Sequence, residues 1–181
     1  MNPIRRVGRG AGWSPRTLRA ACKGEIDRDS VIAVVQRVST ASVSVEGATV
    51  SRIGPGLVAL LGVAHDDTGE DAQALGRKIV GLRVFADDRG LMNRSVAEIG
   101  GQVLVVSQFT LLGEISKGRR PSFVTAAKPE VAMPLVEAVV AVIAESGVPV
   151  STGIFGANMT VALVNEGPVT VIVRTESGRV T

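Results

Sequence analysis

Four residues near the middle of the chain could together line a site at the end of a strand. Ser107, Gln108, Phe109 and Thr110 follow an apolar run, 102–106, with the composition of a buried strand. A hydroxyl can attack a carbonyl carbon, and free backbone N–H groups can stabilise the resulting oxyanion. No base stands next to Ser107 or Thr110 in the sequence. Three interpretations stay open: a serine hydrolase, a pocket that works without a side-chain base, or an ordinary strand end.

The only histidine, His65, is the other candidate base. Asp66 or Asp67 could orient its ring, but nothing else in the sequence resembles a nucleophile–base pair, so a solvated loop histidine is favoured. The neighbouring acids could also suggest a metal. Glu70 and Asp71 are better explained as acids at a helix N-terminus, where the helix dipole favours them. We therefore expect no metal site.

Three cations lie close together beside a glycine in a predicted loop. Lys117, Arg119 and Arg120 could contact phosphate, because guanidinium groups bind phosphate oxygens in pairs. Runs this short are also common in solvated loops, and both interpretations stay open. Aromatic side chains are scarce, so an open platform that stacks single-stranded bases is disfavoured. After Val31 the aromatic residues are Phe85, Phe109, Phe123 and Phe155.

The stretch Asn-Glu-Gly-Pro at 165–168 separates two runs rich in Val, Ile and Leu. Such residues between β-branched runs predict a turn, with the proline at the start or edge of a strand because it lacks an N–H donor. The same residues would also suit a rigid piece of backbone placed for chemistry. Local rules do not decide between these two interpretations.

The elements that position these residues alternate short strands with two helices. The capping-box pattern at Thr68 and Asp71 predicts a helix from 68 to about 85, and a second is predicted at 130–146 with Pro134 in its early turns. Close succession of strands predicts antiparallel hairpins. Strands are predicted at 31–38, 41–45, 48–53, 57–64, 102–106, 148–155, 158–164 and 169–174.

The 181 residues are enough for one core, and no apolar run approaches the ~20 residues of a membrane span. Residues 1–30 hold seven of the basic residues and three of the acids, a net charge of +4, whereas the other 151 residues have a net charge of −1. We expect 1–30 to be either a disordered basic extension or residues upstream of the natural start. No cysteine follows Val31, which excludes disulfides and cysteine catalysis there.

From Val31 to about Arg174 the chain resembles the D-aminoacyl-tRNA deacylases, also called D-tyrosyl-tRNA(Tyr) deacylases. The matching stretches are AVVQRVS (33–39), KIVGLRVF (78–85), MNRSV (92–96), SQFTL (107–111), KGRRPSF (117–123) and FGANMTVALVNEGPVT (155–170). SQFTL and NxGPVT are the two signatures of this family, and both occur in order and at the family's spacing. The chain departs from the family at Leu112, where tyrosine is frequent, and at Leu91, where lysine is frequent.

The resemblance implies an α+β fold: mostly antiparallel β-sheets curled into a barrel- or sandwich-like core with two main helices, in a homodimer. The deacylase domain would span 31–181. The implied reaction is hydrolysis of the ester of D-aminoacyl-tRNA, and of glycine mischarged on tRNA, in the cytoplasm. Neither a cofactor nor a DNA or membrane partner is implied. The alternative is a non-catalytic dimer that binds RNA or a small ligand.

The resemblance also implies roles for particular residues. Gly167 and Pro168 would form a cis peptide that enters the partner subunit's site and rejects L-amino acids, supported by Arg37 and Asn165. The tRNA ribose hydroxyl would help to activate water. The catalytic pocket would be formed by Ser107, Gln108, Phe109 and Thr110, and phosphate contacts would come from Lys117, Arg119 and Arg120.

Overall fold

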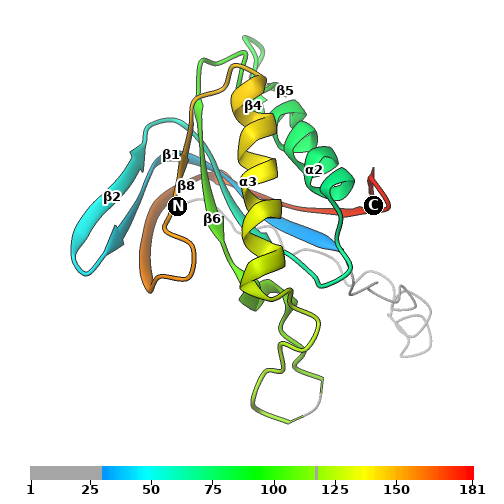
Figure 1. Cartoon of the computed structure of the whole chain (residues 1–181). Helices are drawn as coiled ribbons and strands as arrows, with labels where there is room; N and C mark the ends of the chain where they lie inside the picture. The colour runs from blue at the N-terminus through cyan, green and yellow to red at the C-terminus, as the bar shows by residue number, and fades with distance from the viewer. Residues whose placement is uncertain (1–29, 117) are drawn as a thin grey trace, which may run out of the picture.

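The computed structural model describes residues 30–116 and 118–181 (Figure 1). Apart from Ser30, the extension expected at 1–30 therefore lies outside the described residues, as does Lys117. The elements run in the order β1 (Val31–Val45), β2 (Ala48–Ile53), β3 (Gly56–Gly62), α2 (Gly69–Gly81), β4 (Phe85–Ala86), β5 (Met92–Arg94), β6 (Gln102–Ser107), the 3₁₀ helix η1 (Phe109–Leu112), α3 (Pro129–Glu145), β7 (Val150–Thr152), β8 (Met159–Glu176) and β9 (Arg179–Val180).

One mixed sheet of seven strands organises the domain, and α2 and α3 lie side by side on one of its faces (Figure 1). The strand order is β7-β6-β3-β1-β8-β9, and β2 pairs with β1. The predicted α+β class, with a curled and mostly antiparallel sheet and two main helices, is confirmed. The antiparallel pairing expected for the closely spaced strands of 31–64 is confirmed for β1–β2 and β1–β3, whereas β3–β6 and β6–β7 pair in parallel. Parallel neighbours need a crossover, and here each crossover contains a helix.

The central strands β3 and β6 are buried on both faces. On one face they pack against the helices through Leu57, Leu61, Val105, Leu75 and Ile143, among others. On the other face the outer halves of β1 and β8, together with β2, curl over them. That second core contains Val38, Ala41, Val43, Ile53, Val58, Leu104 and Val106. Burial on both faces explains why β3 and β6 are almost continuously apolar.

The helices begin where the sequence predicts, but α2 ends early. A capping box joins Thr68 and Asp71 at its start, as expected. The prediction that α2 continues to about 85 is wrong: Leu82 is already extended, and the chain then buries Val84 and Phe85 in the helix-side core. This tertiary burial overrides the helical spacing. The second helix, α3, matches its prediction, with Pro134 inside.

Asp71 also ties α2 to the C-terminal hairpin β8–β9. Its carboxylate, in a residue only 3% exposed, accepts hydrogen bonds from the Gly178 N–H at 2.7 Å and the Thr68 hydroxyl at 2.6 Å. Its carbonyl oxygen accepts from the Thr175 hydroxyl at 3.1 Å. Burial raises the pKa of this carboxyl, but the bonds from Thr68 and Gly178 outweigh it, and the pKa lies below its ordinary value of 3.8.

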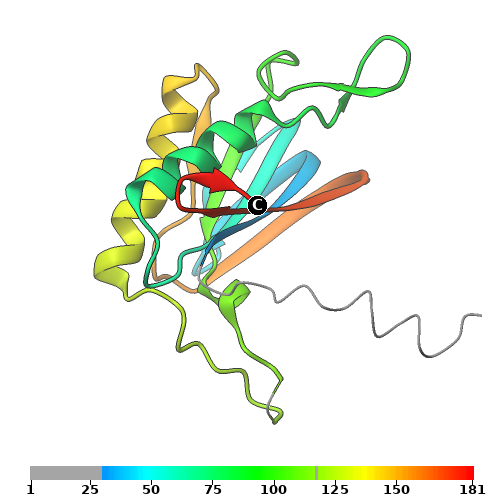
Figure 2. The same cartoon turned by 90° about the vertical axis from the view of Figure 1, so that its right-hand side faces the viewer.

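The segment 165–168 is not a turn between two strands, and that interpretation is wrong. Strand β8 runs through it, and its pairing with β1 passes from Gln36↔Thr170 to Val38↔Asn165. Residues 166–169 therefore lie opposite Arg37 alone and bulge out of the ladder. Figure 2 shows this bend of β8 on the right, on the side of the molecule away from α3.

Candidate active site

A pocket of about 600 Å³ lies where β6 ends, between η1, the start of α3 and the segment before β8. Most of its lining is apolar. It contains Ser107, Gln108 and Phe109, and thus unites three of the four residues that the sequence singled out. The remaining lining residues are Leu61, Val63, Val106, Phe123, Ala126, Ala127, Lys128, Pro129, Ala132, Val136, Phe155, Gly156, Ala157, Asn158, Met159 and Val161.

Backbone hydrogen bonds hold the turn after β6 in place. The N–H of Gln108 donates to the Leu61 carbonyl at 2.6 Å, and the N–H of Leu111 donates to the Gln108 carbonyl at 3.2 Å. Phe109 and Thr110 open η1, and the first N–H groups of a helix have no acceptor within it. Neither of those two N–H groups therefore has an acceptor within η1.

Thr110 does not line the pocket. Its hydroxyl oxygen instead accepts a short hydrogen bond from the side-chain amide of Gln108. This bond orients the amide but supplies no base, because an amide nitrogen cannot take a proton from the hydroxyl. The geometry therefore provides a positioned pair and not an activated nucleophile.

Aromatic rings form one wall of the site. The rings of Phe109 and Phe123 meet edge to face, with centroids 5.0 Å apart and planes at 71°. Phe109 is 57% exposed, so this contact with Phe123 holds a ring that would otherwise be free. Sequence reasoning did not assign Phe123, Phe155 or Met159 to the site. Their motifs were recognised, but only the fold shows that both stretches reach Ser107.

The bend of β8 forms a second feature, built from Gly167 and Pro168, whose peptide bond is cis. Gly167 has φ = +113°, a conformation that L side chains rarely adopt. A Cβ added there would lie 2.8 Å from Nη2 of Arg37 and 2.9 Å from the Val169 side chain. Only glycine therefore fits this position without movement of its neighbours. Neither Gly167 nor Pro168 lines the pocket of its own chain.

Arg37 and Asn165 brace this bend from inside. Nη1 of Arg37 donates a short hydrogen bond to the Val84 carbonyl, between α2 and β4. The Asn165 amide donates to the Val169 carbonyl at 3.0 Å and to the Arg37 carbonyl at 3.3 Å. The two side chains thus fix both ends of the bulge to β1 and to the segment that follows α2.

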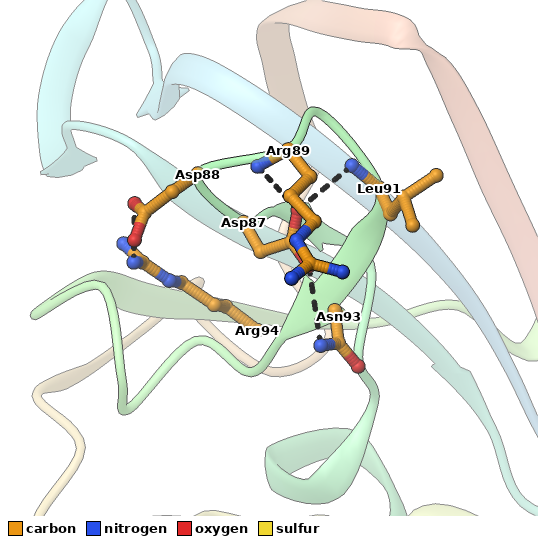
Figure 3. A network of polar contacts seen from close by, with 6 residues as sticks. All are labelled: Asp87, Asp88, Arg89, Leu91, Asn93 and Arg94. Atoms are coloured by element: carbon orange, nitrogen blue, oxygen red, sulfur yellow. Dashed lines mark hydrogen bonds and ion pairs between the residues drawn. The ribbon is translucent and has the colours of Figure 1, made fainter.

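The hairpin β4–β5 continues from Val84 and contains its own network of polar contacts (Figure 3). One carboxylate oxygen of Asp87 accepts from the N–H groups of Arg89 at 2.9 Å and Leu91 at 3.0 Å, and the other accepts from the Asn93 amide. The backbone bonds from Leu91 and Arg89 hold the pKa of Asp87 below its ordinary value. A stable hairpin gives the Val84 carbonyl a fixed position from which to hold Arg37.

Other candidate residues lie apart from the pocket. Arg119 and Arg120 are exposed on a loop that the bridge between Glu114 and Ser122 closes, and Figure 1 shows this loop extending away from the body. The His65 side chain is 48% exposed, with Nδ1 2.9 Å from Asp66. Among residues 30–116 and 118–181, no cluster of acidic and histidine side chains could hold a metal, and no helix is long and apolar enough to cross a membrane.

Comparisons with known proteins find close relatives in sequence and a close match in fold. The chain is 58% identical over 139 residues to a D-aminoacyl-tRNA deacylase of Bacillus velezensis, covering 77% of this chain and 95% of the relative. It is 55% identical over 141 residues to a D-aminoacyl-tRNA deacylase of Thermus aquaticus, covering 78% and 93%. A solved structure, the c-Myc DNA Unwinding Element Binding Protein, matches with a TM-score of 0.76 and 38% identity, covering 81% and 99%.

The family model named D-Tyr-tRNA(Tyr) deacylase matches residues 34–174, which include β1 from its fourth residue, the pocket and nearly all of β8. The stretch holds both the SQFTL turn and the braced Gly167–Pro168 bend. With relatives that are more than half identical over nearly their whole length, this match leaves one conclusion. The chain belongs to the D-Tyr-tRNA(Tyr) deacylase family.

Proposed function

We propose that this protein hydrolyses the ester bond of D-aminoacyl-tRNA, releasing the D-amino acid and free tRNA. One observation carries the proposal. The SQFTL turn, in a chain that belongs to the family, lines an apolar pocket, and the N–H groups that open η1 have no acceptor within that helix. A pocket of about 600 Å³ lies within the usual range for small-ligand sites, and is large enough for a nucleoside.

The terminal adenosine would lie in the pocket with its ester carbonyl at Phe109 and Thr110. Their N–H groups would stabilise negative charge on that oxygen as water attacks the carbonyl carbon. The 2′-hydroxyl of the terminal ribose would help to activate the water, because neither Ser107 nor Thr110 has a neighbouring side-chain base. The reaction then needs no cofactor.

Selection against L-amino acids would come from a second copy of the chain. The bend at Gly167–Pro168 is exposed and lies outside its own pocket, so it can enter the pocket of a partner in a homodimer. Its backbone would occupy the space that an L side chain needs, whereas a D-aminoacyl or glycyl group would fit. Exclusion of the L side chain by fixed backbone atoms gives specificity even when the enzyme makes no favourable contact with the D side chain. Arg37 and Asn165 would keep the bend in this position.

The loop that carries Lys117, Arg119 and Arg120 would contact tRNA phosphates beyond the terminal nucleotide. Arg119 and Arg120 are exposed and outside the pocket, as a contact with the acceptor stem requires. Because the rest of the chain after residue 30 is close to neutral, few phosphates would be contacted and the salt dependence would be shallow.

A second candidate function is nucleic-acid binding without catalysis. It is favoured by the solved structure at 38% identity, whose name describes a DNA-binding protein. The apolar pocket and the scarcity of aromatic residues favour the first candidate.

One experiment separates the two candidates. The purified protein is mixed with an excess of D-tyrosyl-tRNA or L-tyrosyl-tRNA, and ester loss is followed with and without a competing DNA duplex. Many D-esters cleaved per dimer, with the L-ester spared and no effect of DNA, support the deacylase. Stoichiometric binding without turnover, displaced by DNA, supports the alternative and refutes the first proposal.

A further inference from the structure

The pocket contains a single charged side chain, that of Lys128, and every other lining residue is apolar or neutral. Lys128 is exposed, so its ammonium group remains hydrated at the rim. Within the described part of the chain, no carboxylate lies within ion-pair distance of it. A cation without a partner at the mouth of an apolar pocket is available for an anionic ligand.

The backbone of Lys128 is held on both sides. The N–H of the preceding Ala127 donates to the Val63 carbonyl of the β3 end at 2.9 Å. The Lys128 carbonyl accepts from the N–H groups of Val131 at 3.0 Å and Ala132 at 2.9 Å. Only the side chain is therefore free to move, and its reach is limited to the pocket rim. This arrangement differs from Arg119 and Arg120, which lie on a projecting loop.

We propose that Lys128 binds the phosphate that joins the terminal adenosine of the tRNA to the preceding nucleotide. This inference rests on the proposed function, because it takes the nucleoside to occupy the pocket. The ester end of that nucleoside must lie at Ser107 and Phe109, where the N–H groups are. The aminoacyl α-ammonium group lies at that ester end, so the charge at the other end of the nucleoside is the 5′-phosphate, which leaves the pocket at the rim. Lys128 thereby fixes the depth at which the nucleoside is bound.

The test compares two small substrates that differ only in this phosphate: 3′-D-tyrosyl-adenosine and its 5′-monophosphate. With the wild-type protein we expect a lower KM for the monophosphate. In Lys128→Ala, the KM for the monophosphate rises about two- to fivefold, the size expected for an exposed ion pair, and kcat is unchanged. The phosphate-free substrate is unaffected. Lys128→Arg restores the low KM, and Lys78→Ala, which changes an exposed lysine of α2 outside the pocket, has no effect.

The full substrate supplies a second readout. With D-tyrosyl-tRNA, log kcat/KM falls as log salt rises, and removal of one phosphate contact makes this slope shallower by about 0.7. Equal kinetics of wild type and Lys128→Ala on all substrates, or an equal loss with and without the phosphate, overturns the role of Lys128 alone. Failure of the wild type to hydrolyse D-tyrosyl-tRNA overturns the proposed function, and this inference with it.

Discussion

The substitution Gly167→Ala tests the role of the β8 bend most directly. At φ = +113° an alanine is strained whatever the space around it, by about 1–3 kcal/mol. Its Cβ would also meet Nη2 of Arg37 at 2.8 Å and the Val169 side chain at 2.9 Å. Relief of these contacts requires either a shift of the Arg37 guanidinium from the Val84 carbonyl or a change in the path of the bend.

Both forms of relief displace the backbone that the proposal places in the partner's pocket. If about 1.4 kcal/mol of this strain changes the relative free energies of the D and L transition states, the preference for the D-ester over the L-ester changes about tenfold. We therefore expect the ratio of kcat/KM for D-tyrosyl-tRNA over L-tyrosyl-tRNA to fall by about tenfold or more, through slower D cleavage or newly permitted L cleavage.

The assay is single-enzyme kinetics on both esters, combined with thermal unfolding of the same preparation. Val164→Ala serves as the matched control, because Val164 is 55% exposed on the same strand, outside the bulge. A Gly167→Ala protein that keeps its rate, its D/L ratio and its unfolding temperature would refute the assignment of the bend. A protein that is only less stable, with an unchanged D/L ratio, would show that the glycine serves folding and not selection.

Three further predictions follow from the same geometry. Ser107→Ala should retain activity within about tenfold, because the proposal assigns the chemistry to the tRNA ribose and the backbone; abolished activity and labelling by an acylating reagent would instead indicate a serine hydrolase. Asp71→Asn should lower the free energy of unfolding by about 1–3 kcal/mol at neutral pH, measured by urea denaturation. Because the folded pKa of Asp71 is depressed below 3.8, its contribution is present above that pH and is lost as pH falls through the folded value, so wild type and variant should converge in acid. Replacing both Arg119 and Arg120 with alanine should weaken binding of tRNA at low salt without changing the D/L ratio; a changed ratio would contradict a pure phosphate role.

The sequence predicts correctly those helix boundaries that depend on neighbouring residues. The capping box at Thr68 and Asp71 and the span of α3 could be read from spacing alone, because neighbouring residues determine them. The early end of α2 could not, since it depends on the burial of Val84 and Phe85 against distant strands. The parallel pairing of β3 with β6 depends likewise on the crossover that contains α2.

The candidate site shows the same division. The turn at Ser107 stands out because polar residues abruptly follow an apolar run. The partners of that turn in the pocket, Phe155 and Met159, come from about fifty residues later in the chain, and no local pattern connects them to it. At 165–168 the local pattern was misleading, because turn-forming residues are also the residues that a bulge requires. Pairing with β1 decides between a turn and a bulge, because the extra residues of β8 lie opposite Arg37 alone.

The two parts of the proposed site explain how one enzyme could act on many D-amino acids. The pocket is neutral apart from Lys128, so no charged group within it selects a particular amino-acid side chain. Selection would instead fall to the bend, where fixed peptide atoms exclude a substituent on one side of the substrate's Cα, whatever its chemistry. A filter of this kind needs rigidity more than contact area. Two side chains brace 166–169 within each subunit: Asn165 of β8 bonds the carbonyls of Arg37 and Val169, and Arg37 of β1 bonds the Val84 carbonyl, which follows α2.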